Sequence, residues 1–315
     1  MDEITYWVNG EFVPASRAVM PLNNRGYRLG DGVFDTERTF NGKLFKLDAH
    51  LERLGRSLKM LRIDLGMSLE ELGRCAEETV ERNLHRLEHD GDWWVTQTIH
   101  RGDGGNPLNP APPFISIIVE PLAFARFAPY YTKGAHLVIP SGRSSARTGM
   151  DPKLKAVSRL AMVLADLETK RMDEDAWSLV LDEEGNLAEV FYGNLFLVRE
   201  GAIRTPTPRA ILEGITRATT IGLAREAGYE VIEQNLQPYD LYTADEAFIT
   251  TTSYCILPVS ELNGAPIGEA VPGPVTQRLT EAWNGVAGLD VAEQMRRYAG
   301  LAGPTRAAQP ITAAR

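Results

Sequence analysis

Two lysines stand close together in the segment DPKLKAVSRLAMVLADLE, which covers residues 151–168. The residues after them predict a helix with one apolar, buried face, formed by Leu160, Val163, Leu164 and Leu167. Lys153 is readily explained as a solvated side chain, whereas Lys155, where an irregular loop passes into a buried helix, needs a further explanation. A lysine amine can form an imine with an aldehyde, which would give Lys155 a chemical role.

A second group of residues has the properties of a phosphate site. Gly214, Ile215 and Thr216 open a predicted helix, and the first backbone N–H groups of a helix are unpaired and carry partial positive charge. The hydroxyls of Thr216 and of Thr252, in the run TTTS at 250–253, can add donors. Arg53 can add a charge-assisted bidentate contact.

A third feature is an acid in an apolar setting, Glu189 in NLAEVFYGNLF. A buried carboxylate can keep a pyridinium nitrogen protonated, which makes the ring an electron sink. Lysine, carboxylate and phosphate-binding groups together describe a site for pyridoxal 5'-phosphate. Taken singly, each residue has an ordinary structural explanation, so the interpretation depends on their order and co-occurrence.

The elements that must position these residues are mixed hairpins and helices. Asn9-Gly10 and Asn41-Gly42 predict tight hairpin turns. Asp48 is expected to cap one helix, and Ser68 with Glu71 forms a capping box for a second. Strands are expected at DWWVTQTIHRG and PFISIIVEP, and further along the chain at AHLVIP, EVIEQNL and EAFITTT.

This pattern predicts an α+β fold with two domains. The expected division is a small N-terminal domain at 1–122, an aperiodic aromatic linker at 123–134, a larger cofactor-binding domain at 135–290 and a tail at 291–315. A final helix is expected at about 276–283.

Several segments in the same order resemble the class IV aminotransferases, the fold-type IV family of pyridoxal-phosphate enzymes. The resemblance runs from about Tyr6 to Trp283 and is carried by RGYRLGDGVFDTERTFNGKLFKLDAHLERL, DPKLKAVSRL, GNLAEVFYGNLFLV, ILEGITRATTIGLAREAGYEV and LYTADEAFITTTSYCILPVSELNG. It implies a two-domain fold-type IV enzyme that forms a homodimer with its sites near the subunit boundary.

The resemblance also implies roles for individual residues. Lys155 matches the catalytic Schiff-base lysine, Glu189 the acid at the pyridine nitrogen, and Arg53 the phosphate-binding arginine. The remaining cofactor contacts would come from Ile215, Thr216, Thr251 and Thr252.

Three departures from the family pattern concern the substrate. Leu160, preceded by Arg159, stands where branched-chain members carry a tyrosine, Val190 replaces the glycine after the glutamate, and the strand at 93–100 has no arginine. The candidates for substrate contacts are therefore Arg28 and Arg38 for a carboxylate, Phe34 for an apolar wall, and Trp94.

The expected activity is transfer of an amino group between an apolar amino acid or amine and a 2-keto acid. Branched-chain amino acids are the default expectation, and D-amino acids and (R)-amines stay open. Two alternatives are an aminodeoxychorismate lyase, which the SRL after the lysine resembles, and a non-catalytic binding protein on the same fold.

The composition excludes other classes of protein. A net charge of −9 without a basic run argues against nucleic-acid binding. Two cysteines and five histidines, scattered over 315 residues, predict neither a disulfide framework nor a metal site. No signal peptide or membrane-length apolar run is evident, so the expected location is the cytoplasm, with no membrane partner.

Overall fold

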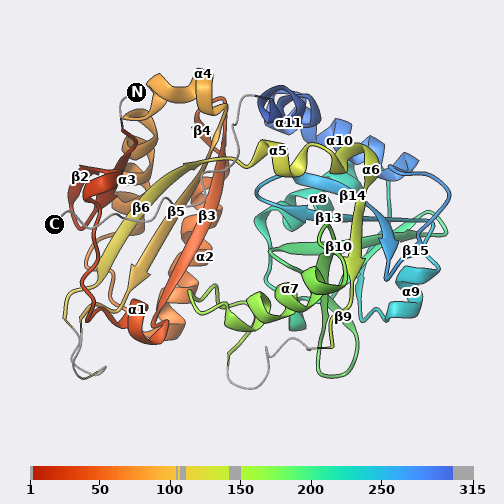
Figure 1. Cartoon of the computed structure of the whole chain (residues 1–315), viewed down its shortest axis with the longest axis horizontal. Coiled ribbons are helices and arrows are strands. Elements are labelled where there is room, and N and C mark those ends of the chain that lie inside the picture. The colour runs from red at the N-terminus through yellow and green to blue at the C-terminus, as the bar shows by residue number, and fades with distance from the viewer. Residues whose placement is uncertain (1–2, 104–105, 107–110, 142–149, 301–315) are drawn as a thin grey trace.

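The computed structural model describes residues 3–103, 106, 111–141 and 150–300, which form two sheets with helices around them (Figure 1). The first sheet has six strands in the order β2-β1-β6-β5-β3-β4, and the second has nine. The mixed α+β character predicted from the sequence is confirmed.

The first sheet is antiparallel and is built around its longest strands. Its strands are β1 (Thr5–Val8), β2 (Glu11–Pro14), β3 (Gly32–Phe40), β4 (Lys43–Leu44), β5 (Trp93–His100) and β6 (Phe114–Pro121). Helix α2 (Leu47–Leu61) packs against β3, and α3 (Leu69–Glu81) packs against β1 and β6. The short elements η1 (Ala15–Arg17), α1 (Arg25–Leu29), η2 (Leu84–Arg86) and α4 (Leu87–Asp90) complete this part.

Local signals predicted several of these elements. Asn9 and Asn41 have φ angles of 48° and 50°, as the two predicted Asn-Gly hairpin turns require. The capping box of Ser68 and Glu71 is present. Asp48 is not the N-cap of α2, because the helix begins at Leu47 and Asp48 lies in its first turn, where a negative charge is also favourable.

The second sheet is mixed, with the path β12-β11-β10-β13-β14-β7-β8-β9; β9 also pairs with β10 and β15 with β14. Its strands are β7 (Ala135–Val138), β8 (Trp177–Leu181), β9 (Leu187–Val190), β10 (Gly193–Arg199), β11 (Ala202–Pro206), β12 (Val231–Gln234), β13 (Glu246–Thr251), β14 (Cys255–Leu262) and β15 (Ala265–Pro266). Around it lie α7 (Leu160–Met172), η4 (Pro208–Ala210), α8 (Ile215–Glu226), α9 (Pro238–Tyr242) and α10 (Pro274–Ala287).

The connection between the sheets is more ordered than the sequence suggests. Residues 123–134 contain two short helices, α5 (Phe124–Phe127) and α6 (Tyr130–Lys133), whose aromatic side chains are buried. The aperiodic sequence hides them because each helix has only four residues.

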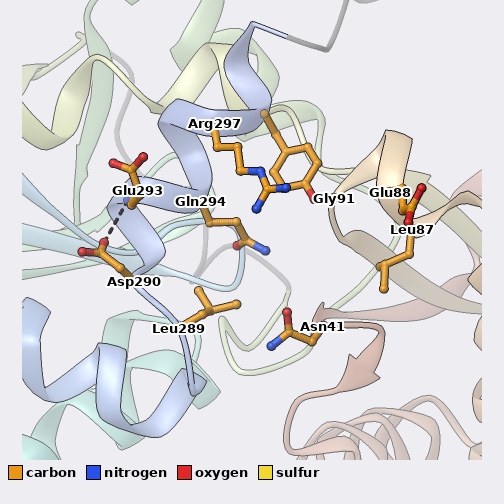
Figure 2. A pocket seen from close by; sticks show the side chains of 10 residues that line it. Asn41, Leu87, Glu88, Gly91, Leu289, Asp290, Glu293, Gln294 and Arg297 are labelled. Carbon is orange, nitrogen blue, oxygen red and sulfur yellow. Dashed lines mark hydrogen bonds between the residues drawn. The ribbon is translucent and has the colours of Figure 1, made fainter.

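The chain after residue 290 also differs from the expected tail. Residues 291–299 form helix α11 (Val291–Ala299), capped by the Asp290 carboxylate and anchored by the buried side chains of Val291 and Met295. Helix α11 packs on α5, and a cleft of about 300 Å³ separates it from the β3–β4 turn and α4 (Figure 2).

Helix α7 forms as predicted, but its apolar face does not point inward. Leu160, Val163, Leu164 and Leu167 are 65%, 38%, 57% and 54% exposed, whereas Met162, Ala165 and Thr169 are buried. The prediction of a buried leucine face was wrong because periodicity identifies an apolar stripe without saying what covers it.

Candidate active site

Lys155 lies on a segment that runs along the edge of β3. The Phe34 N–H donates to the Lys155 carbonyl at 3.0 Å, and the Val157 N–H donates to the Gly32 carbonyl at 3.1 Å. Ala156 forms a bridge with Val33. These contacts tie residues between β7 and α7 to the first sheet, so they fix the lysine between the two sheets.

The side chain of Lys155 points across the ring of Phe34, with Nζ 4.5 Å from the ring centroid. Burial by the walls of the pocket, and then the charge of Arg53, lower the pKa of Lys155 from 10.5 to about 7. An amine with such a pKa is partly unprotonated at neutral pH, so it can act as a nucleophile or accept a proton.

Arg53 extends from α2 toward the same pocket and is held by a buried carboxylate. Its Nε and Nη2 donate to the two oxygens of Asp35 at 2.7 and 2.6 Å, and Nη1 donates to the Glu213 carbonyl at 3.1 Å. Burial opposes ionisation, but Arg53 and His50 hold the pKa of Asp35 well below its usual range. The guanidinium is therefore fixed beside the start of α8.

Asp35, Glu37 and His50 form a compact buried cluster behind Arg53. Both Asp35 oxygens are already in contact with Arg53, and one also contacts His50 Nδ1 at 2.8 Å. Burial raises the pKa of Glu37, which accepts a hydrogen bond from Gln97, and burial lowers the pKa of His50. The cluster therefore supports Arg53.

The start of α8 lies against the pocket without a capping side chain. Gly214 is the N-cap residue, and Gly214, Ile215 and Thr216 line the pocket. A Cβ atom at Gly214 would meet Asn194 Oδ1 at 2.2 Å, so a larger residue would require the helix start or the Asn194 side chain to move. Because no side chain in the described part of the protein caps this helix end, its first N–H groups are available to an anion.

The hydroxyl run at the end of β13 also lines the pocket. Thr252 Oγ1 donates to the Thr36 carbonyl at 3.3 Å, and Thr251 Oγ1 donates to the Tyr192 carbonyl at 2.8 Å. Thr250 Oγ1 is buried in the pocket wall without a hydrogen-bond partner among the described residues.

Glu189 is buried on β9 and accepts a hydrogen bond from the Leu212 N–H at 3.1 Å. Burial raises the pKa of Glu189, although Arg159, the Leu212 N–H and Lys155 act in the opposite direction. The structure thus brings together all the residues that the sequence singled out for the cofactor: Arg53, Lys155, Glu189, Ile215, Thr216, Thr251 and Thr252.

The four candidate substrate residues have different surroundings. Phe34 faces the Lys155 amine, and Arg28 is exposed near the end of α1. Trp94 Nε1 donates to Ser253 Oγ at 3.0 Å, beside the hydroxyl run.

Arg38 is saturated by structural contacts. It is 1% exposed and donates to the Thr39 and Ser253 carbonyls at 3.0 Å and to Gln294 Oε1 at 2.7 Å. These bonds join β3 to α11 and to the β13–β14 turn, which leaves the guanidinium without a free edge for a carboxylate. The partners lie 215 and 256 residues away in sequence, so the sequence could not reveal them.

Gly193, Leu212 and four residues with polar side chains line the pocket without having been assigned a role from the sequence; the four are Arg159, Tyr192, Asn194 and Thr250. The one sequence signal for Arg159 is its place in the lysine segment, directly before helix α7. Tyr192 has a φ of 63°, a conformation that placed it in the pocket wall but that no sequence signal gives away.

No helix among the described residues has the length and apolar character needed to cross a membrane.

Comparison with known proteins gives a consistent result. A family model described as amino-transferase class IV matches residues 32–262. A putative branched-chain-amino-acid aminotransferase of Methanocaldococcus jannaschii is 34% identical over 89% of this chain and 95% of its own length. A D-alanine aminotransferase of Bacillus licheniformis is 30% identical over 87% and 94%.

Comparison with solved structures also points to aminotransferases. The crystal structure of the T.th. branched-chain amino acid aminotransferase with pyridoxamine 5'-phosphate matches with a TM-score of 0.81 and 31% identity, over 96% of this chain and 98% of that one.

Proposed function

The chain belongs to the class IV aminotransferases, and we propose that it is a pyridoxal-phosphate-dependent transaminase for apolar amino acids. The single observation that carries the proposal is the convergence of Lys155, Glu189 and the start of α8 on one pocket. These groups come from segments far apart in the sequence, and each suits a different part of the same cofactor.

The residues present fit that cofactor. The uncapped start of α8 together with Arg53 suits a phosphate. The buried Thr250 Oγ1 has no hydrogen-bond partner among the described residues, so it suits a bound polar group. Ile215, Thr216 and Thr252 would complete the phosphate site. Glu189 would hold the ring nitrogen in its protonated form.

Pyridoxal 5'-phosphate supplies an electron sink that stabilises negative charge at the substrate carbon next to the amino group. Lys155 would carry the cofactor before the substrate arrives and would then be free as a base. With a pKa of about 7, its Nζ can take the proton from that carbon and return it at the neighbouring position. Phe34, beside Nζ, would exclude water from the amine.

The proposed donor class follows the relatives, whose names include branched-chain amino acids and D-alanine. Branched-chain amino acids remain the default, and the handedness of the donor stays open. Transfer of the amino group to a 2-keto acid distinguishes this activity from the lyase alternative, which would release pyruvate without an acceptor.

We also propose a homodimer, on the evidence of the exposed leucine face of α7. This face adjoins the lysine segment, and exposed apolar side chains on α1, among them Tyr27 and Leu29, add to the surface available for a second copy. A cytoplasmic location stays a prediction, which cell fractionation would test.

The test is an absorbance scan of purified protein loaded with pyridoxal 5'-phosphate. The lysine-bound cofactor should absorb near visible wavelengths, and the band should decrease when a reacting donor is added. A panel of L- and D-amino acids and chiral amines identifies the donor class. The Lys155→Ala variant should lack the band, and Lys153→Ala should keep it; a wild-type protein without the band would refute the proposal.

A further inference from the structure

The side-chain amide of Gln294, on α11, lies between two buried charges of opposite sign. Its Oε1 accepts a hydrogen bond from Arg38 Nη2 at 2.7 Å, and its Nε2 donates to Asp92 Oδ2 at 2.6 Å. Arg38 Nη2 and Asp92 Oδ2 are 4.0 Å apart, and their side chains are 1% and 0% exposed. One amide therefore bridges both members of a separated ion pair.

The Asp92 carboxylate is fixed by further hydrogen bonds. It accepts from the backbone N–H groups of Asn41 and Gly42 at 3.0 and 2.9 Å, and from Thr39 Oγ1 at 2.5 Å. These donors belong to the end of β3 and to the turn that follows it. A change in the bridging amide should therefore act on the longer, more adaptable side chain of Arg38.

The other end of the Arg38 guanidinium holds a turn at the pocket. Its Nη1 donates to the Ser253 carbonyl at 3.0 Å, in the β13–β14 turn. Thr252, the preceding residue, lines the pocket and is one of the proposed cofactor contacts. Trp94 Nε1 reaches the hydroxyl of Ser253, whereas Arg38 holds the backbone of the turn.

The geometry puts the two partners of Arg38 in competition. Opposite charges attract strongly where water is excluded, and a buried pair is most stable in direct contact. A shift of about 1 Å would bring the guanidinium of Arg38 to hydrogen-bond distance of Asp92. The amide of Gln294 satisfies both groups at their present separation. Without it, direct pairing would draw Arg38 toward Asp92 and weaken its bond to Ser253.

We propose that Gln294 is a positioning residue: it keeps Arg38 apart from Asp92, so that the guanidinium holds the β13–β14 turn at the pocket. It acts from outside the pocket, because it extends from α11 into the separate cleft between this helix and the β3–β4 turn (Figure 2). The effect on the turn follows from these contacts alone. The effect on the cofactor rests on the proposed function.

The first test needs no cofactor. Gln294→Met retains the length of the side chain but removes both hydrogen-bonding groups. In the stripped protein, hydrogen exchange read by peptide mass spectrometry should become about threefold faster or more in the peptide that contains residues 252–254. The peptide that contains the β1–β2 hairpin should exchange as in the wild type, which shows that the variant is folded.

Gln277→Met is the matched control. Gln277 is an exposed glutamine on α10, and its amide donates to the Pro272 carbonyl at 2.9 Å. Its replacement also removes an amide hydrogen bond from a C-terminal helix, but at a distance from Arg38 in the network. Exchange in the 252–254 peptide should stay at the wild-type rate.

Gln294→Glu should have an effect that depends on pH. One of its oxygens can still accept from Arg38, but the other faces Asp92, so the two acids must share a proton. Relative to the wild type at the same pH, the affinity of the stripped protein for pyridoxal 5'-phosphate should be nearly unchanged at about pH 5 and about 10-fold lower or more at about pH 8. Gln294→Met should lower it about 3- to 10-fold at both pH values.

The remaining charged groups around position 294 are common to both variants. They are Glu88 across the cleft and Asp290, Glu293 and Arg297 on α11. Their titration therefore cancels when Gln294→Glu is compared with Gln294→Met by equilibrium dialysis. Gln277→Glu, which adds a carboxylate at an exposed position, should bind the cofactor as the wild type does at both pH values.

A wild-type exchange rate of the 252–254 peptide in Gln294→Met would overturn the inference. So would a loss of affinity in Gln294→Glu that is the same at both pH values, because it would show that the side chain only packs. If the exchange rate rises as expected but the wild-type protein forms no visible band with pyridoxal 5'-phosphate, the proposed function fails while the positioning role of Gln294 stands.

Discussion

The amine of Lys155 is 4.5 Å from the Phe34 ring centroid, and the burial and neighbouring charge that surround it lower its pKa to about 7. Lysine is strongly hydrated and ordinarily protonated, so this environment changes which chemistry it can do. The charge of Arg53 contributes to the lowered pKa of Lys155, and Asp35 holds the Arg53 guanidinium in place. In the proposed function, reactivity and cofactor binding would therefore be coupled through the buried Arg53–Asp35 ion pair.

The lowered pKa predicts how Lys155 reacts in the protein stripped of cofactor. The unprotonated fraction of its amine should grow as the pH rises through about 7, because the pKa lies below that of an ordinary lysine. A small amine-reactive reagent, followed by peptide mass spectrometry, measures this at each lysine. Modification of Lys155 that rises only together with the exposed lysines, near pH 10, would contradict the expectation.

Substitution of Asp35 by asparagine tests the support of Arg53. Asparagine retains one acceptor oxygen but lacks the charge, so Arg53 should lose its fixed position, and the affinity for pyridoxal 5'-phosphate should fall by about 10- to 100-fold. Equilibrium dialysis of the stripped protein measures this.

Asp31→Asn is the matched control, because Asp31 also pairs with arginines, Arg25 and Arg101, but does not line the pocket. An equal loss of affinity in both variants would show that the effect is not specific to Arg53.

Helix α8 lines the pocket with its N-terminal end. Its N-cap is glycine, its first turn contains Ile215 and Thr216, and no side chain of the residues that the structure describes caps its N–H groups. The same helix anchors itself deeper in the fold, where the Trp283 indole of α10 donates to Thr220 Oγ1 at 3.0 Å. This contact should hold in place the helix end that we propose for the phosphate.

Gly214→Ala should damage this end. The added Cβ would meet Asn194 Oδ1 at 2.2 Å, so either the helix start or Asn194 must shift, and affinity for the cofactor should fall by roughly 10-fold or more. Gly222→Ala on the same helix meets nothing within 4 Å.

This control should raise the free energy of unfolding by about 0.5–1 kcal/mol and leave cofactor affinity unchanged. Wild-type affinity in Gly214→Ala would argue against a phosphate at this helix end.

The sequence predicted those elements that are determined by interactions between residues close together in the chain. The hairpin turns at Asn9 and Asn41 and the capping box at Ser68 are determined within a few residues, and these predictions are confirmed. The start of α8 at Ile215 is confirmed for the same reason. The four-residue helices α5 and α6 were not predicted, because they are too short to show a period.

The candidate site residues were predicted partly from local context and partly from the family resemblance. What neither could show is how side chains far apart in the sequence share partners. The Asp35 contact with Arg53 spans 18 residues and the Arg53 contact with Glu213 spans 160. Such pairings follow from the way the two sheets meet, and they cannot be predicted from patterns in a single sequence.

The pocket lies where the two sheets of the molecule meet. Lys155 and its neighbours pair with β3, Arg53 reaches Glu213, and Thr252 reaches the Thr36 carbonyl. Each of these contacts joins a segment from one side to a segment from the other. A shift of one sheet against the other would therefore separate the proposed base, Lys155, from the proposed phosphate site at the start of α8.

The exposed stripe of α7 predicts association of two copies. The double variant Leu164→Glu/Leu167→Glu places two charges on this face and should shift the protein from dimer to monomer in sedimentation velocity. Tyr239→Glu, at a 69% exposed aromatic on α9, is the control and should keep the wild-type state. A double variant that sediments as the wild type does would exclude this face as the contact.

The most direct test of the central claim identifies the amine that holds the cofactor. The purified protein is loaded with pyridoxal 5'-phosphate, reduced with borohydride to make the bond permanent, and digested for peptide mass spectrometry. The account predicts a phosphopyridoxyl group on Lys155 and an unmodified Lys153 in the same peptide region. A label spread over exposed lysines, with Lys155 free, would contradict it.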